Sequence, residues 1–490
     1  MNILRKALSP VVAVALLLVV AVVAVVMFST WFDSFRTSLF TAAETKTSES
    51  QTVDIIDLVG EDLFFQAGTN TSVSSVKVSG NECEFSSGVF SGLHVFDLTS
   101  CLDASSSSVE AVVVTDKGIY SKKFFVGESY HSRELLPVQL WNVTYDGGNH
   151  DYGKGVAIDS SSNIYVTGYS NNNATEDYLT LKYDSNGNQI WNVSYDGGAL
   201  DWGAALTVDV LGNVYVTGRS NTSVNNDYLT FKYDSNGNQI WNVTYDSGTG
   251  ADAAYGTTVD TSGNVYVTGG KNNGVDYDIL TFKYDSNGDQ IWNVTYDGGN
   301  GYDWGNDIAV DSLGNVYVTG NYYNGLNYDY VTVKYNSLGN EIWNVTNSGG
   351  NGYDWGDGIA VDSLGNVYVT GGTYNGVDYD MLTFKYDSSG VQIWNVTYDS
   401  GNGNDPSYGI TLDTSGNVYV IGTSQNGVTS DLIIFKYAAN GNQIWNVSYD
   451  SGNNDGGAEI VLDTSGNIYV EGTSNNGANN DFLTLKYAQE

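Results

Sequence analysis

The chain has few basic residues for its length of 490. Lys and Arg number 19 against 56 Asp and Glu, which gives a formal net charge of −37. Nucleic-acid binding is excluded, because clustered Lys and Arg hold phosphate backbones and no basic stripe is present. The same charge keeps a protein soluble and repels anionic lipid. Adaptation to high salt is an alternative source of the charge, but abundant Asn dilutes that signal.

Cysteine and histidine are also scarce, at two and three residues. Cys83 and Cys101 predict one disulfide closing a loop of about 18 residues, since a metal or redox pair would need Cys-x-x-Cys spacing or extra His ligands. His94, His131 and His150 accompany neither a Gly-x-Ser-x-Gly nor a His-Glu-x-x-His motif. We therefore expect no catalytic residue, no metal and no cofactor. A surface glycosidase or lyase is the alternative, because carboxylates are abundant.

The chain is instead rich in repetition. Seven tryptophans, each followed by Asn-Val-Thr or Asn-Val-Ser, recur at steps of 50 or 51 residues: Trp141, Trp191, Trp241, Trp292, Trp343, Trp394 and Trp445. Each unit holds four strand-length runs separated by turn residues, and in one unit these are 239–245, 255–259, 264–268 and 277–284. A period of this length with four strands predicts a mainly β fold with a seven-bladed β-propeller.

The order of the runs predicts how the ring closes. We name the strands A (ending in an Asp), B (Val-Tyr-Val-Thr), C (ending in Lys-Tyr) and D (the Trp strand). The region begins with a D strand near 139–145 and ends with a C strand at 482–487. Pairing these two would seal the propeller with its own N-terminal strand and remove the open edge. An open solenoid is the alternative, and it would need polar caps that the sequence lacks.

The phrases Asp-Ser-x-Gly-Asn-Val-Tyr-Val-Thr-Gly and Asp-Tyr-x-Thr-x-Lys-Tyr-Asp-x-x-Gly-x-x-x-Trp resemble the SBBP-type β-propeller repeat of prokaryotic surface proteins. The resemblance covers residues 138–490. It implies the fold far more than a function, because that family has little shared activity.

The N-terminus predicts export. Arg5 and Lys6 precede an apolar run of membrane-spanning length, which favours a cytoplasmic N-terminus and an extracellular remainder. The segment resembles the class III signal and N-terminal helix of archaeal type IV pilin-like proteins. That resemblance implies a leader at 1–7 cut by prepilin peptidase between Ala7 and Leu8, and an apolar helix at 8–40 that packs with other pilin-like subunits after leaving the membrane. The alternative is a signal anchor that is never cut.

Between the helix and the propeller lies a second predicted domain. After a linker at 41–53, residues 54–126 alternate apolar and polar residues in short runs, which predicts a small β-sandwich placed as a pilin-like head. Residues 127–137 link it to the propeller.

Exported context makes the Asn-x-Ser/Thr sequons candidates for N-glycosylation. Seven follow the repeat tryptophans, and their Asn side chains should face away from Trp on the outermost strand. Bare Asn that merely follows the repeat is the alternative. The sequons are at Asn70, Asn142, Asn173, Asn192, Asn221, Asn242, Asn293, Asn344, Asn395 and Asn446.

Alternating strand directions place the D–A and B–C loops on one face, which carries the sequence variation and points away from the cell. The D–A loops repeat an aromatic residue before Gly, which suits stacking on sugars beside carboxylates. Packing between blades is the competing interpretation. The candidate binding residues are Tyr152, Trp202, Tyr255, Trp304, Trp355 and Tyr408. The Lys of each C strand is expected to form a structural ion pair with the Asp that ends strand A.

Together these features predict a pilin-like cell-surface filament subunit that displays a propeller for adhesion or recognition, with surface glycans as candidate ligands. The alternative is a membrane-anchored structural surface protein.

Overall fold

A computed structural model describes residues 136–489, apart from 172–174, 222–224, 300 and 349–351, together with the backbone of six strands between 53 and 125. The chain divides into two compact units, Met1–Ser132 and Arg133–Glu490. The predicted leader, apolar helix and linkers up to residue 135 lie outside the described residues, as do Cys83, Cys101 and His131. Among the residues that are described, no helix is long and apolar enough to span a membrane.

The first unit contains a six-stranded antiparallel sheet with the order β1-β2-β5-β6, and both β3 and β4 pair with β2. The β content agrees with the sequence prediction, whereas its division into two sandwich layers stays a prediction. The strands are β1 (Val53–Val59), β2 (Asp62–Val78), β3 (Asn81–Glu82), β4 (Gly88–Asp97), β5 (Ser108–Thr115) and β6 (Gly118–Phe125).

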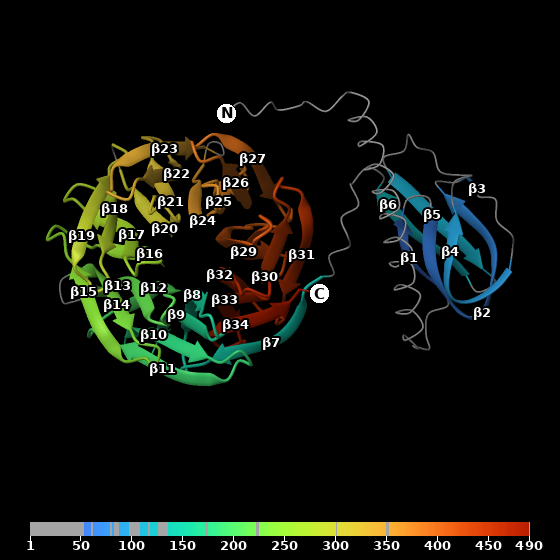
Figure 1. The fold of residues 1–490 in the computed structure, drawn as a ribbon, viewed down its shortest axis with the longest axis horizontal. Coiled ribbons are helices and arrows are strands. Elements are labelled where there is room, and N and C mark those ends of the chain that lie inside the picture. Colours follow the sequence, from blue (N-terminus) through green and yellow to red (C-terminus); the bar gives the residue numbers. More distant parts are fainter. Residues whose placement is uncertain are drawn as a thin grey trace, which may run out of the picture. The chain divides into compact units, whose positions relative to one another are not determined.

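The second unit is a seven-bladed propeller, and each blade is a four-stranded antiparallel sheet (Figure 1). The innermost strands, A, are β8 (Asp151–Ile158), β12 (Asp201–Val208), β16 (Ala253–Val259), β20 (Trp304–Val310), β24 (Trp355–Val361), β28 (Ser407–Leu412) and β32 (Asp455–Leu462). The B strands are β9 (Ile164–Asn171), β13 (Val214–Asn221), β17 (Val265–Asn272), β21 (Val316–Tyr323), β25 (Val367–Tyr374), β29 (Val418–Gln425) and β33 (Ile468–Asn475).

The outer half of each blade completes the sheet. The C strands are β10 (Glu176–Tyr183), β14 (Asn226–Tyr233), β18 (Tyr277–Tyr284), β22 (Tyr328–Tyr335), β26 (Tyr379–Tyr386), β30 (Ser430–Tyr437) and β34 (Asn480–Ala488). The outermost D strands are β7 (Val138–Tyr145), β11 (Gln189–Tyr195), β15 (Gln239–Tyr245), β19 (Gln290–Tyr296), β23 (Glu341–Asn347), β27 (Gln392–Tyr398) and β31 (Gln443–Tyr449).

The predicted closure is confirmed. The last sheet has the order β32-β33-β34-β7, so the first strand of the propeller completes its last blade. In the register of this pair Leu485 lies opposite Asn142 and Lys486 opposite Trp141. The same Lys–Trp and aromatic/aliphatic–Asn pairing occurs inside the other blades, for example Lys182 with Trp191. The closing blade therefore has the same strand pairing as the covalently continuous ones, and the open-solenoid alternative is wrong.

The hydrophobic core lies between blades. One cluster joins Tyr165 and Tyr178 of the first blade to Leu206, Val216 and Phe231 of the second. An equivalent cluster crosses the junction between the last blade and the first. Because these apolar layers are shared by neighbours, no single blade buries its own hydrophobic faces.

A repeated polar contact ties each blade to the next at the face of the tight turns. Lys182 Nζ and Trp191 Nε1 both donate to the carbonyl oxygen of Ser235, at 3.0 and 3.1 Å, in the C–D turn of the next blade. The same ammonium lies 4.7 Å from the centre of the Tyr165 ring, whose hydroxyl donates to Asp159. The expected Lys–Asp ion pair is therefore wrong for Lys182: its ammonium lies over the Tyr165 ring and donates its hydrogen bond to a backbone carbonyl of the next blade.

The closing blade contains one exception to the repeat. Where five other B strands bury a threonine, such as Thr167, β33 carries Glu471, which is fully buried. Its Oε2 accepts a hydrogen bond from Thr484 at 2.7 Å, but its Oε1 has no hydrogen-bond partner. Burial raises the pKa of this carboxyl well above its ordinary value. Glu471 is thus a buried carboxyl in the closing blade, with one oxygen that has no hydrogen-bond partner.

We expect Glu471→Thr to raise the free energy of unfolding at neutral pH by about 1 to 3 kcal/mol, the usual cost of a buried polar group without a partner. Urea unfolding of the full chain would measure it. Glu471→Gln, which keeps the size of the side chain, is the control. A destabilised Glu471→Thr variant would show that the glutamate is required for closure.

Candidate functional site

Each innermost strand bulges at the same position. In the first blade Gly153 pairs with Gly168 and Gly155 with Thr167, which leaves Lys154 as an extra residue. The other six A strands show the same register shift. A β-bulge redirects the side chain of its extra residue. The seven bulge residues are Lys154, Ala204, Tyr255, Asn306, Asp357, Tyr408 and Ala458.

All seven bulge residues line a single cavity of about 470 Å³, which we call the axial cavity. Because each blade contributes its innermost strand, the cavity lies at the centre of the ring (Figure 1). Its volume is within the usual range for small-molecule sites. Other side chains that line it are Tyr169, Trp202, Arg219, Asp307, Thr423, Glu459 and Thr473.

Charges of opposite sign occupy different sectors of the cavity. Lys154 and Arg219 come from the first two blades, whereas Asp307, Asp357 and Glu459 come from the fourth, fifth and seventh. Asp307, Asp357 and Glu459 are half-buried, which weakens the solvation of their charged forms, whereas the Lys154 side chain is more exposed.

Burial favours the neutral forms of the three carboxyls and of Lys154. Burial raises the pKa of Asp357 to about 7, although the Trp355 hydrogen bond and the Lys154 charge oppose the shift. The pKa values of Asp307 and Glu459 are raised by burial, and in Glu459 also by the charge of Asp307. Burial lowers the pKa of Lys154. The carboxyls therefore titrate near neutral pH, where they can both donate and accept hydrogen bonds.

Hydrogen bonds from the blades hold two of the carboxyls in place. Asp307 accepts from the backbone N–H of Ile308 at 2.7 Å and, across the blade junction, from that of Ile359 at 2.9 Å. Asp357 accepts from Trp355 Nε1 at 2.5 Å and from Asn306 Nδ2 at 3.3 Å. These contacts come from rigid strands, so the carboxyl positions are set before any ligand arrives.

An aromatic stack forms the wall on the positive side. The Tyr169 and Trp202 rings are nearly parallel, with centres 4.6 Å apart. The guanidinium of Arg219 lies 3.6 Å from the centre of the Trp202 ring, and Arg219 Nε is buried without a hydrogen-bond partner. The Trp202 indole N–H also donates to Glu176. The Trp202 ring thus lies between the Tyr169 ring and the Arg219 guanidinium, which holds the cation at the cavity wall.

The six aromatic residues predicted as binding residues separate into two groups. Trp202, Tyr255 and Tyr408 line the axial cavity, whereas Tyr152, Trp304 and Trp355 are not among its lining residues. Trp304 stacks on Tyr277 with centres 4.3 Å apart, and it covers Gly270 so closely that a Cβ there would meet the indole at 2.3 Å. Packing therefore explains the position of Trp304, whereas Trp202, Tyr255 and Tyr408 lie at the wall of the axial cavity.

The sequence pattern of an aromatic residue before Gly combined two different positions of the repeat. Tyr152, Trp202, Trp304 and Trp355 directly follow the Asp that begins the blade, whereas Tyr255 and Tyr408 lie two residues further on, at the bulge. A Gly follows both positions, which made them look equivalent. Aligning the units on the Asp that ends strand A separates them.

Lys154, Arg219, Asn306, Asp307, Asp357 and Glu459 were missed as site residues. The available signal was divergence within a repeat: the positions around the bulge change from blade to blade, while the flanking positions hardly change. His150 lies in a loop, where its Nδ1 accepts a hydrogen bond from the backbone N–H of Asn480 at 3.2 Å.

In the repeated Trp-Asn sequons, the Asn side chain faces away from the Trp side chain, as predicted. Along β7 and β11 the Trp is partly buried, whereas Asn142 and Asn192 are exposed. Occupancy by glycans stays a prediction. Asn173 lies outside the described residues, and at Asn70 only the backbone is described.

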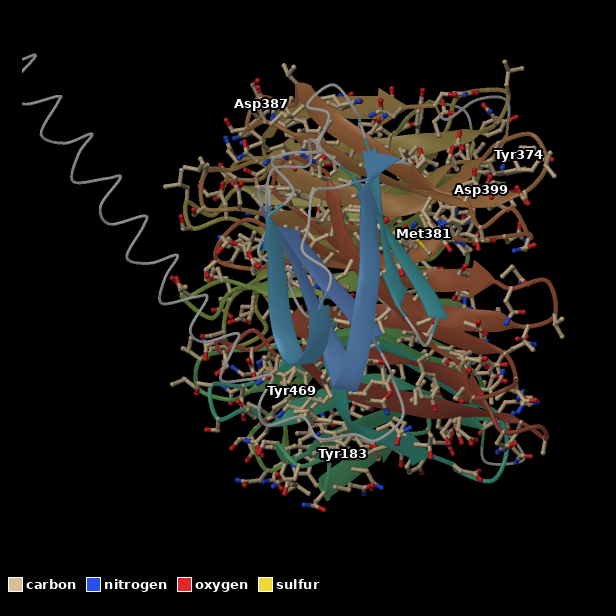
Figure 2. The ribbon with its side chains drawn as sticks, turned by 90° about the vertical axis from the view of Figure 1, so that its right-hand side faces the viewer. Tyr183, Tyr374, Met381, Asp387, Asp399 and Tyr469 are labelled. Carbon is tan, nitrogen blue, oxygen red and sulfur yellow. The ribbon has the colours of Figure 1, made fainter. Side chains whose placement is uncertain are left out.

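The loop arrangement is also as predicted. Viewed edge-on, Asp387 of a C–D turn lies on one face of the propeller, and Tyr374 and Asp399, from a B–C and a D–A loop, lie on the other (Figure 2). Variable and tight-turn loops therefore occupy opposite faces.

The fold and the repeats define a seven-bladed β-propeller. The family described as SBBP, Beta-propeller repeat, matches residues 143–173, 196–223, 293–321 and 348–376, so the chain carries SBBP-type repeats. No curated protein matches the chain.

Three solved structures are similar in part. The polysaccharide lyase Uly1 has 10% sequence identity and a TM-score of 0.48, with 74% of this chain and 94% of that chain covered. The WD40 domain of Toxoplasma gondii coronin has 10% identity and a TM-score of 0.46, with 72% and 88% covered. The propeller domain of the Trilobed protease from Pyrococcus furiosus has 7% identity and a TM-score of 0.43, with 72% and 96% covered. These similarities carry no argument about activity or ligand.

We expect Glu459→Gln to stabilise the protein at pH 7 but not at pH 4. The pKa of Glu459 is raised above its ordinary value of 4.5, so above that pH the folded chain retains a proton that the unfolded chain releases. The free energy of unfolding of the wild type therefore falls as pH rises past 4.5, and glutamine removes this contribution, roughly 1 to 3 kcal/mol.

Urea unfolding at both pH values would measure the difference. Gln can still accept the 3.0 Å hydrogen bond that Ile460 N donates to Glu459 Oε1, so loss of that bond does not confound the result. An equal effect at pH 4 and pH 7 would contradict a raised pKa.

Proposed function

We propose that the propeller is a recognition module that binds a saccharide unit in the axial cavity. The observation that carries the proposal is that all seven bulge residues face one cavity and differ between otherwise repeated blades. Variation of these positions on a rigid repeated scaffold is typical of residues that bind a ligand and are not needed for folding.

The cavity chemistry supports a sugar as the ligand. Tyr255 and Tyr408 offer aromatic rings for stacking, and Asn306, Asp307, Asp357 and Glu459 offer hydrogen-bond partners for hydroxyl groups. Lys154 and Arg219 add positive charge, which favours a sugar that carries a carboxylate.

The sequence supports display of this module at the cell surface. The pilin-like features of residues 1–40 favour a filament subunit that is inserted in the membrane as a precursor, cut by prepilin peptidase and assembled with other subunits. Adhesion through surface glycans is the corresponding role. An uncut anchor carrying a structural propeller is the alternative at this level.

A second candidate function is hydrolysis or elimination on a polysaccharide. Asp307, Asp357 and Glu459 have pKa values raised toward neutrality in one cavity, and general acid–base catalysis needs carboxyls of this kind. Release of product from a polysaccharide that the chain also binds would favour this candidate over recognition alone.

We expect Lys154→Ala to weaken binding of an acidic saccharide roughly tenfold or more, since one charge-assisted hydrogen bond accounts for about 1.5 to 3 kcal/mol. The bulge position is already Ala in two blades, so folding should be unaffected. Lys271→Ala, outside the cavity lining, is the matched control. Calorimetric titration of the full chain with neutral and uronic-acid oligosaccharides would measure affinity. Unchanged affinity of the Lys154→Ala variant, or binding of neither sugar class, would contradict the proposal.

We expect the protein recovered from native cell surfaces to begin at Leu8, because a pilin-like subunit loses its charged leader before assembly. N-terminal sequencing or mass spectrometry of the first peptide would test this. A start at Met1 would replace the filament subunit with an uncut membrane anchor and leave the saccharide proposal unaffected.

A further inference from the structure

Blade junctions on the variable face gather aspartates from three different strands. At the junction between the last and first blades these are Asp146 after β7, Asp151 at the start of β8 and Asp481 in β34. One oxygen of each lies within 4.8 Å of one oxygen of each of the others. Three further junctions form the same cluster, including Asp380, Asp399 and Asp405. These clusters are separate from the axial cavity, whose lining includes none of them.

Hydrogen bonds fix these carboxylates but leave part of their oxygens without a partner. Asp151 Oδ2 accepts from the N–H of Gly147 at 2.5 Å, and Asp481 Oδ2 accepts from Asn476 Nδ2 at 3.0 Å. Asp481 Oδ1 is buried without a hydrogen-bond partner, whereas Asp151 also accepts from the Ser170 hydroxyl and from the backbone N–H of Asn171. Asp151 is 0% and Asp481 5% exposed, so bulk water does not solvate them.

The junction between the fifth and sixth blades repeats this feature. Asp380 is 4% exposed, its Oδ2 accepts from Asn375 Nδ2 at 3.0 Å, and its Oδ1 is buried without a partner. Asp405 is fully buried and accepts from two backbone N–H groups, those of Ser400 and Gln425. Buried carboxylate oxygens close to like charges carry a large free-energy cost unless a proton or a bound cation neutralises them.

The repeated lysines do not supply that cation. Lys486 Nζ, which is on the same strand as Asp481, donates to the carbonyl of Ser185 at 3.2 Å. Ser185 belongs to a C–D turn, and these turns occupy the opposite face. At the closing junction, the electrostatic effect of His150 lowers the pKa of Asp481. The junction of the fifth and sixth blades has no His in the corresponding loop.

The arrangement fits calcium. Calcium takes six to eight oxygen ligands at about 2.3 to 2.6 Å, so two oxygens on opposite sides of the ion are roughly 4.6 to 5.2 Å apart. The clustered oxygens meet that limit, and all three donors are carboxylates. We propose that these inter-blade aspartate clusters bind calcium ions, which fasten the D–A loop of each junction to the neighbouring C strand.

One junction provides a natural control. Between the fourth and fifth blades Ser348 stands where Asp146 and Asp399 stand elsewhere, and its side chain hydrogen-bonds to Asp329. Among the described residues this junction forms no three-carboxylate cluster. The fold therefore accepts Ser at this position, and Asp146→Ser removes a cluster with a substitution that the scaffold already contains.

The test is calcium binding by the full chain after removal of bound ions with a chelator. Equilibrium dialysis should give at least four ions per chain, and calcium should raise the Tm. Asp146→Ser should lose one ion, and Ser348→Asp, which completes a fifth cluster, should gain one. Asp234→Asn removes the same charge from the opposite face, where Asn336 already occupies the equivalent turn position, so it should leave the stoichiometry unchanged.

Extracellular calcium modules bind with dissociation constants of roughly 10⁻⁴ to 10⁻³ M, so the titration should extend to about 10 mM. Absence of calcium binding in that range would overturn the proposal. Binding that is unchanged in both Asp146→Ser and Ser348→Asp would also overturn it, because the ions would then lie elsewhere. The gain expected for Ser348→Asp keeps the test informative even if the loss variant folds poorly.

Discussion

The pairing of β7 with β34 is the contact on which the rest of the propeller depends. The apolar layers lie between blades, so each blade is stable only while both neighbours are in place. A ring of this kind has no terminal blade that could tolerate an open side. The N-terminal strand of the propeller supplies the missing D strand of the last blade, and the Lys486–Trp141 pairing there repeats the internal one. Closure therefore preserves a core that is shared by every pair of neighbours.

Closure also explains why the axial cavity exists. Seven innermost strands surround the centre, and each carries a bulge at the same register position. At the bulge, one residue per blade has no partner on the neighbouring strand, so its side chain need not pack within the sheet. Polar and charged side chains can then differ from blade to blade without disturbing the shared apolar layers. Placing carboxyls at these half-buried positions disfavours their charged forms, which raises the pKa of Asp357.

Most of the propeller could be predicted from the sequence because the same short strand pattern, which is weak in one copy, recurs in seven repeats. The Trp spacing gives the blade number, and the order of the runs, D first and C last, gives the closure. Side-chain partners were harder to predict. Lys182 faces both an aspartate-bound tyrosine and a carbonyl of the next blade, and only the geometry between blades shows that the carbonyl is its hydrogen-bond acceptor. The cavity residues were hidden for a related reason: Tyr255 lies at the bulge of its strand, whereas Trp304 lies two residues before the bulge of its own, and both are followed by Gly.

The sealing strand is also the strand through which the propeller is attached to the preceding unit of the chain. Any tension along the polypeptide between the two units therefore enters the propeller at β7, which shares one sheet with the C-terminal strand. Mechanical load and ring closure thus act on the same backbone hydrogen bonds. A pull strong enough to detach β7 would therefore open the ring at one defined seam, between β7 and β34.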